Sequence, residues 1–131
     1  MKKDIKIPEV KNVYIAVVQE HNDIYKTNDW NAYIINDKDI SLEMILIVTR
    51  GYDEKRGTST MRHKLEQLPP KSYAKIELIH EDVLELNNEF VVTYFEDNKM
   101  YDKTFLFRKN AINKKAFQTI PLMNIRGVLV K

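Results

Sequence analysis

Short runs of β-branched and aromatic residues, in which apolar and polar positions alternate, recur along most of the chain. An alternation with a period of two places every second side chain on one face of a strand, so each run predicts a half-buried β-strand. Clusters of turn-forming residues separate the runs, among them 36–39, 68–71 and 96–99. The seven predicted strands span residues 12–19, 30–36, 42–49, 58–65, 73–79, 89–95 and 101–107.

The same alternation predicts which side chains face the core. Within each run we take the more apolar of the two faces as the inward one. The residues predicted to face inward are Val13, Ile15, Val17, Trp30, Ala32, Ile34, Leu42, Met44, Leu46, Val48, Met61, Leu65, Ala74, Ile76, Leu78, Phe90, Val92, Tyr94, Tyr101, Phe105 and Phe107.

Seven short strands at near-regular spacing favour an all-β fold, an immunoglobulin-like antiparallel β-sandwich. A small β-barrel is the alternative. In the immunoglobulin order, the loops that follow the first, third and fifth strands share one end of the sandwich.

The pattern changes after residue 110. Asn110 is a suitable N-cap for a short helix over 111–118, Pro121 would end it, and 125–130 could form a last strand. A second helical turn is expected at 81–86. We therefore expect a sandwich domain over 1–110 and a C-terminal extension over 111–131.

Composition excludes several classes of protein. The chain has 131 residues, 44% of them hydrophobic and 31% charged, which suits one folded domain. It contains no cysteine, which excludes disulfides, thiolate nucleophiles and Cys-ligated zinc. Its 3 glycines are too far apart for a P-loop or a dinucleotide fingerprint. Apolar runs reach only six residues and no signal peptide is recognisable, so we expect a cytoplasmic protein without a membrane partner. The excess of Lys over Arg favours a bacterial source.

Charge is distributed unevenly along the chain. Residues 1–102 carry 14 Lys and Arg against 19 Asp and Glu, whereas 103–131 carry 7 basic residues and no acidic one. A basic end on an acidic body could attract an anionic partner such as RNA. The same end is too apolar for a free arm, because it also holds Ile112, Phe117, Leu122, Ile125, Val128 and Leu129. We therefore expect it to dock on its own domain or on a second copy.

The basic residues of 50–64 and 108–131 form the candidate surface for a partner. Arg62 and Lys64 share the outward face of the fourth predicted strand, where basic side chains could hold phosphates or could instead protect a sheet edge. The candidate binding residues are Arg50, Tyr52, Lys55, Arg56, Arg62, Lys64, Arg108, Lys109, Lys114 and Lys115.

A metal site is the weaker candidate. Imidazoles and carboxylates are suitable ligands for a divalent cation, and the immunoglobulin order would bring two such loops to one end. These residues are His21, Asp23, His80, Glu81 and Asp82. Their spacing matches no known ligand motif, so no cofactor is expected. Ser59 and His63 lack the flanking glycines of a nucleophile elbow.

Several short segments resemble a known family of proteins. They are 31–36 (NAYIIN), 49–52 (TRGY), 86–90 (LNNEF), 107–110 (FRKN) and 120–122 (IPL). Together they resemble a family of short uncharacterised proteins of Bacteroidetes-type bacteria, some of which are labelled phenylalanyl-tRNA synthetase alpha subunit. The chain is too short and too poor in glycine to supply the ATP-binding motifs of a class II synthetase.

The sequence therefore predicts a non-catalytic module that binds a macromolecule or assembles with itself. The anticipated partner is a protein or a second copy of the chain. Two alternatives stay open, an RNA- or anion-binding protein that uses the basic residues and a small metal-dependent enzyme that uses the His21 and His80 loops.

Overall fold

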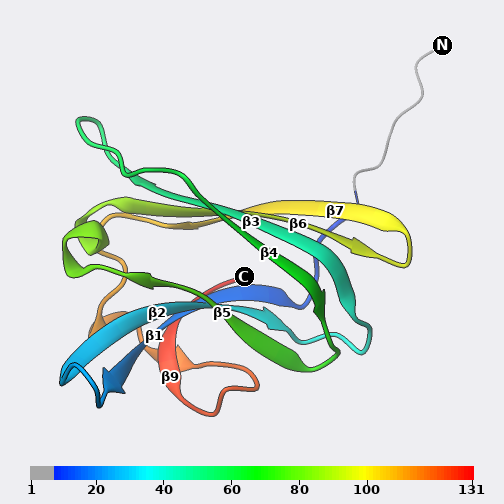
Figure 1. Ribbon diagram of the computed structural model, residues 1–131, viewed down its shortest axis with the longest axis horizontal. Helices are drawn as coiled ribbons and strands as arrows, with labels where there is room; N and C mark the ends of the chain where they lie inside the picture. The colour runs from blue at the N-terminus through cyan, green and yellow to red at the C-terminus, as the bar shows by residue number, and fades with distance from the viewer. Residues whose placement is uncertain (1–7) are drawn as a thin grey trace.

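The computed structural model describes residues 8–131, which form two antiparallel β-sheets packed face to face (Figure 1). The elements are β1 (Val13–Asn22), β2 (Thr27–Asn36), β3 (Leu42–Tyr52), β4 (Met61–Leu68), β5 (Ser72–Ile79), the 3₁₀ helix η1 (Glu81–Glu85), β6 (Asn87–Glu96), β7 (Lys99–Phe107), the 3₁₀ helix η2 (Lys114–Ala116), β8 (Gln118–Thr119) and β9 (Arg126–Val130). The five-stranded sheet has the order β5-β2-β1-β9-β8, and the four-stranded sheet has the order β4-β3-β6-β7.

The predicted β-sandwich is confirmed, and neither sheet of the described chain closes into a barrel. Constant-type immunoglobulin domains group their strands as A-B-E-D and C-F-G. Here the fourth strand, β4, pairs with β3 instead of β5, which leaves β1, β2 and β5 in one sheet and β4, β3, β6 and β7 in the other. The β1–β2, β3–β4 and β5–β6 connections lie at one end of the sandwich, as predicted (left in Figure 1).

Turn chemistry explains the connection at the opposite end between β6 and β7. Glu96 pairs with Lys99 across a two-residue turn, in which Asp97 and Asn98 have φ angles of 51° and 62°. Two consecutive positive φ angles define the type I′ turn, whose twist matches that of a β-hairpin. Lys38 pairs with Glu96 at 3.0 Å and so ties the β2–β3 loop to this hairpin.

The strand alternation was predicted correctly for β1, β2, β6 and β7. Their inward side chains form the main core between the sheets, and Trp30 is only 7% exposed, as expected for a core residue. The opposite face of β1 carries Ala16 and Val18, which belong to a second buried cluster on the outer side of the five-stranded sheet. β1 is therefore buried on both faces.

In β3 the predicted inward face was wrong. Leu42 is buried as predicted, but the next buried residues are Ile45, Ile47 and Thr49, whereas Met44 is 70% exposed. A β-bulge between Glu43 and Leu46 causes the change, with Met44 in the left-handed region at φ 49°. The extra residue reverses the direction of every later side chain in the strand. Leu46 and Val48 consequently point outward.

A second bulge changes β5 in the same way. β5 pairs with β2, and the register shifts between Ala32 and Tyr33. Glu77 pairs with Ala32 and shares its inward face, whereas Leu78, predicted to face inward, is 38% exposed. A carboxylate thus faces the space between the two sheets.

The helix predicted over 111–118 does not form. Asn110 has a φ of 59°, and it is Asn113 whose side chain accepts a hydrogen bond from the backbone N–H of Lys115, so that only the three-residue η2 follows. Phe117 packs edge-on against Trp30 with ring centroids 5.9 Å apart. The last strand, predicted over 125–130, is present as β9.

The outer faces of the two sheets differ. Ile120 and Met123, in the connection between β8 and β9, join the second cluster and cover part of the five-stranded sheet. No element of residues 8–131 covers the outer face of the four-stranded sheet, which forms the upper layer in Figure 1.

Candidate functional site

The uncovered outer face of the four-stranded sheet, called the open face here, is rich in apolar side chains. They come from β3, β6 and β7, because the bulge in β3 turns its second apolar row outward. Its apolar members are Met44, Leu46, Val48, Val91, Phe95, Met100 and Leu106. Met44 and Met100 are the most exposed of these, at 70% and 56%. A contiguous apolar patch with a polar rim is typical of an interaction surface.

Charged side chains lie along both edges of the open face, and Glu66 lies beside Lys64 on the β4 edge. Arg62 and Lys64 of β4 are exposed along one edge, and Asp102 of β7 is exposed along the other. None of the three has an ion-pair partner among residues 8–131. Strand register aligns them in rows: Lys64, Leu46, Thr93 and Asp102 cross the sheet at one level, and Arg62, Val48, Val91 and Thr104 cross it at the next.

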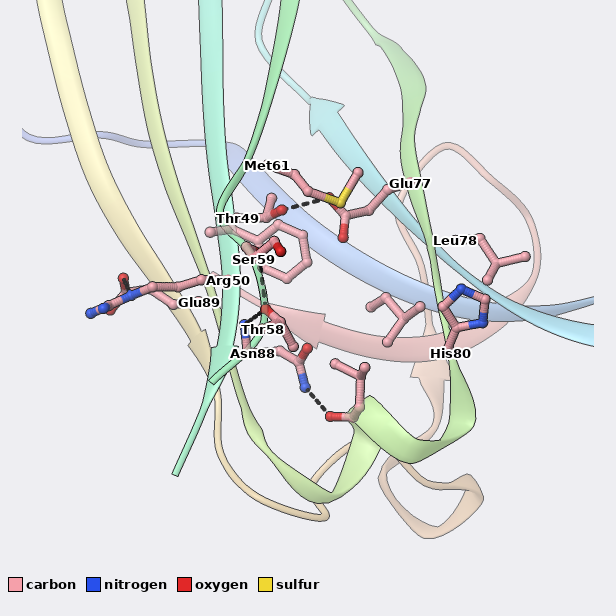
Figure 2. Close-up of a pocket in the computed structure, with 14 residues that line it drawn as sticks. Thr49, Arg50, Thr58, Ser59, Met61, Glu77, Leu78, His80, Asn88 and Glu89 are labelled. Carbon is pink, nitrogen blue, oxygen red and sulfur yellow. Dashed lines mark hydrogen bonds and ion pairs between the residues drawn. The ribbon is translucent and has the colours of Figure 1, made fainter. Parts of the chain in front are cut away.

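A cleft of about 240 Å³ opens where β4 and β5, the edges of the two sheets, part (Figure 2). Its walls are largely apolar and include Ile79, Val83 and Phe90. Glu77 enters the cleft from β5, and its Oε1 accepts hydrogen bonds from Thr49 Oγ1 at 2.6 Å and from His63 Nε2 at 2.7 Å. These two contacts connect three strands and hold the carboxylate in place.

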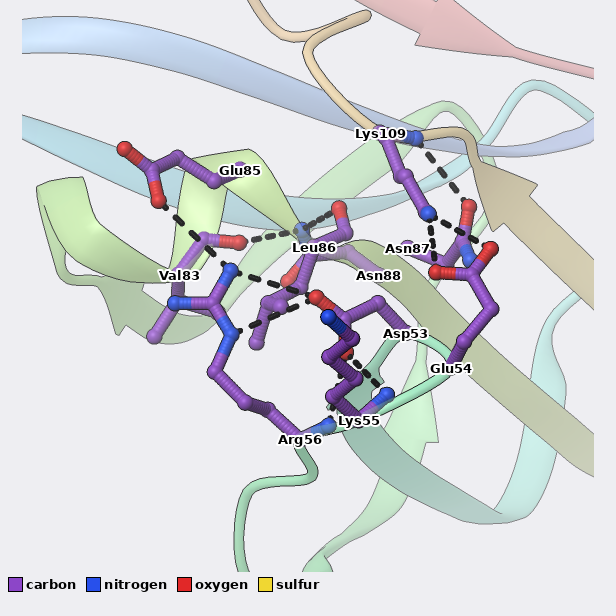
Figure 3. Close-up of polar contacts among 10 residues, drawn as sticks. All are labelled: Asp53, Glu54, Lys55, Arg56, Val83, Glu85, Leu86, Asn87, Asn88 and Lys109. Carbon is purple, nitrogen blue, oxygen red and sulfur yellow. Dashed lines mark hydrogen bonds and ion pairs between the residues drawn. The ribbon is translucent and has the colours of Figure 1, made fainter.

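The predicted basic residues of the β3–β4 hairpin are largely paired with acidic ones. Arg50 contacts Glu89 at 2.9 Å and stacks on the ring of Tyr52. The pKa of Arg50 is raised by the hydrogen bond from its guanidinium to Glu89. Figure 3 shows Arg56 between Asp53 and Glu85, at 3.2 and 3.6 Å.

Lys109 joins the same hairpin. Its Nζ lies 2.6 Å from Glu54, and this hydrogen bond lowers the pKa of the Glu54 carboxyl (Figure 3). The pKa of Asp53 is also lowered, mainly by hydrogen bonds from the backbone N–H groups of Lys55 and Arg56. Both acids therefore stay ionised and neutralise much of the basic charge that was predicted to attract an anion.

The other candidate binding residues do not form one patch with this hairpin. Lys55 is exposed in the hairpin itself and Arg108 is exposed after β7, whereas Arg62 and Lys64 lie on the edge of the open face. Lys114 and Lys115 lie in η2, which contacts β9. The ten residues are thus divided among three parts of the surface.

The candidate metal ligands are also separated. His21 contacts Asp23 at 3.4 Å in the β1–β2 hairpin. His80 precedes η1, and Glu81 and Asp82 occupy its first turn. Residues 8–131 contain no group of three His, Cys, Asp or Glu side chains that could hold a metal ion.

A polar network on the outer side of the five-stranded sheet was not predicted. Glu20 Oε1 accepts hydrogen bonds from the Tyr33 hydroxyl at 2.6 Å and from Asn31 Nδ2 at 2.9 Å. Burial, reinforced by the contact with Glu20, raises the pKa of Tyr33. These contacts tie β1 to β2 and account for polar residues on a largely covered face.

Sequence reasoning missed the residues of the open face and the inward carboxylate. A signal for each was present. The run 42–48 is apolar on both of its faces, and Glu77 is the only acidic residue within 73–79. Both features indicate a strand in which simple alternation fails.

No helix in the described part of the chain is long and apolar enough to cross a membrane. No protein family model matches the sequence, and no curated protein is similar to it. The resemblance to short Bacteroidetes-type proteins therefore stays a prediction, and functional inference depends on the geometry of the open face and the cleft.

Proposed function

We propose that this protein is a non-catalytic assembly module that pairs with a second copy of itself through the open face. The observation that carries the proposal is the arrangement of charge in the rows across the four-stranded sheet. The two central rows each begin with a basic residue on β4 and end with an acidic or polar residue on β7. Lys64, Leu46, Thr93 and Asp102 form one row, and Arg62, Val48, Val91 and Thr104 form the other.

Such rows are self-complementary, because the basic end of a row in one copy can face the acidic or polar end of the same row in a second copy. In a dimer whose two-fold axis runs parallel to the strands and between the two open faces, β4 of one copy lies against β7 of the other at the same level. Lys64 then meets Asp102 of the second copy, and Val48 meets Val91. Packed sheets cross at an angle of about 30°, so facing residues move apart with distance from the crossing point. These residues lie near the middle of their strands, where this displacement is smallest.

The size of the open face suggests a reversible dimer. Four strands about 4.8 Å apart, with roughly 30 Å of length each, give a footprint of about 600 Å². A standard stable interface buries about 800 Å² on each partner. We therefore expect a monomer–dimer equilibrium at micromolar concentrations.

Sedimentation velocity over a range of protein concentrations tests this proposal. The wild-type chain should shift from monomer to dimer as its concentration rises. Val91→Lys places a charge in the middle of the open face and should leave only monomer. The matched control is Ile24→Lys, which changes a side chain that is 84% exposed in the β1–β2 turn and should dimerise normally.

Two results would contradict the proposal. One is a wild-type chain that stays monomeric at every concentration. The other is a Val91→Lys variant that dimerises as well as the control, because the dimer would then use another surface.

A further inference from the structure

The cleft between β4 and β5 has a chemistry distinct from that of the open face. Its walls come from both sheets: Thr49 and Phe90 from the four-stranded sheet, and Glu77 and Ile79 from the five-stranded sheet, and Val83 of η1 also lines it. Ile79 and Phe90 are 4% and 1% exposed, so these parts of the wall belong to the rigid core.

Among residues 8–131, Glu77 supplies the one carboxylate that faces into the cleft. Arg50 and Glu89 also line it, but they point away from its interior and pair with each other (Figure 2). The Oε1 atom of Glu77 already accepts two hydrogen bonds, whereas the other carboxylate oxygen is turned toward the cleft (Figure 2). A carboxylate beside apolar walls is stabilised by a cationic hydrogen-bond donor, the strongest partner for it.

The volume suits a small molecule with an apolar body. An engineered cavity of about 150 Å³ holds a benzene molecule. The cleft, at about 240 Å³, has room for a ring of that size and a short arm that carries a nitrogen.

We propose that this cleft binds a small organic ammonium ion, with its nitrogen on Glu77 and its apolar body against Ile79, Val83 and Phe90. Thr49 and His63 are positioning residues, because their hydrogen bonds orient the carboxylate. The proposal is independent of dimerisation through the open face.

Protonated phenethylamine is the probe that tests the site. It is titrated into the full chain at pH 8, where an ordinary imidazole is neutral and an alkylamine is charged, and binding is followed by amide chemical shifts in ¹H–¹⁵N NMR spectra. The expected shifts centre on Gly51, Ile79 and Val83. The neutral analogue 2-phenylethanol and the anionic 3-phenylpropanoate should each bind at least about tenfold more weakly, which corresponds to roughly 1.4 kcal/mol.

Two variants complete the test. Glu77→Gln keeps an oxygen for Thr49 and His63 but removes the charge, and should weaken phenethylamine binding about tenfold. Glu66→Gln changes an exposed carboxylate of β4 that does not line the cleft and should have no effect. The proposal is overturned if 2-phenylethanol or 3-phenylpropanoate binds the wild-type chain as well as the amine does, or if millimolar phenethylamine shifts no amide of the cleft. The comparison of the amine with 2-phenylethanol and 3-phenylpropanoate uses the wild-type chain. It therefore tests the proposal even if Glu77→Gln fails to fold.

Discussion

Gly127 lies where β9 approaches β1 most closely. A Cβ atom at this position would meet the Val17 carbonyl oxygen at 2.6 Å and Val18 Cγ1 at 2.7 Å. Neither atom belongs to the end of a flexible side chain, so the strand itself would have to move. Its φ angle is not positive, so the backbone conformation does not require a glycine here. The glycine is needed because the two strands lie so close together.

Gly127→Ala should therefore lower the free energy of unfolding by about 1–3 kcal/mol, the usual cost of overpacking. Gly57→Ala is the matched control, because its Cβ would meet nothing closer than 3.9 Å. We expect the control to change stability by no more than about 0.5 kcal/mol. Urea unfolding of the two variants measures the difference, and equal stabilities would refute the close packing of β9 on β1.

At the level of elements, the segment from β8 to β9 acts as a cover for the five-stranded sheet. Ile120 is 1% exposed against Ala16, Val18 and Ile35, and its backbone N–H donates to the carbonyl of Ile125 at 2.9 Å. Charge alone would favour a basic arm over 103–131, but the apolar residues of this segment led us to expect docking, and they account for its position on the sheet.

Ile120→Ala should cost about 2–4 kcal/mol, because it opens a cavity in the second cluster. Ile125→Ala, in the same connection, removes a side chain that is 37% exposed and should cost less than about 1 kcal/mol. Thermal unfolding of the two variants checks the prediction. Similar losses of stability in both would mean that Ile120 does not cover the sheet.

The sequence predicted elements better than it predicted faces. Alternation was sufficient for β1, β2, β6 and β7, because no extra residue interrupts the alternation within these strands. It failed in β3 and β5, because a bulge inserts a residue and reverses the side chains beyond it. In β3 both faces are apolar, so hydrophobicity indicates that alternation is unreliable in this strand but does not locate the reversal. The same two bulges turn Leu46 and Val48 onto the open face and Glu77 into the cleft.

The predicted basic patch depended on distances between loops that a sequence does not contain. Glu54 and Lys109 are far apart along the chain, yet they form an ion pair. Arg50 likewise finds Glu89 on the neighbouring strand. Net charge along the chain therefore overstated the positive charge available to a partner.

For the whole molecule, the proposed dimer pairs two open faces, with β4 of one copy against β7 of the other. Reversal of the charges that meet in such a dimer tests both the surface and its orientation. Lys64 and Asp102 are suitable because both are exposed and neither has an ion-pair partner among residues 8–131. The contact occurs twice in a symmetric dimer, which doubles its effect.

The most direct measurement is the dimer dissociation constant, by sedimentation, of Lys64→Asp, Asp102→Lys and the variant with both changes. Each single change places like charges opposite each other and should weaken the dimer about tenfold. The double variant restores opposite charges and should dimerise within about threefold of the wild-type chain. A double variant no better than the single ones would contradict the proposed pairing of β4 with β7, and a monomeric wild-type chain would contradict self-assembly altogether.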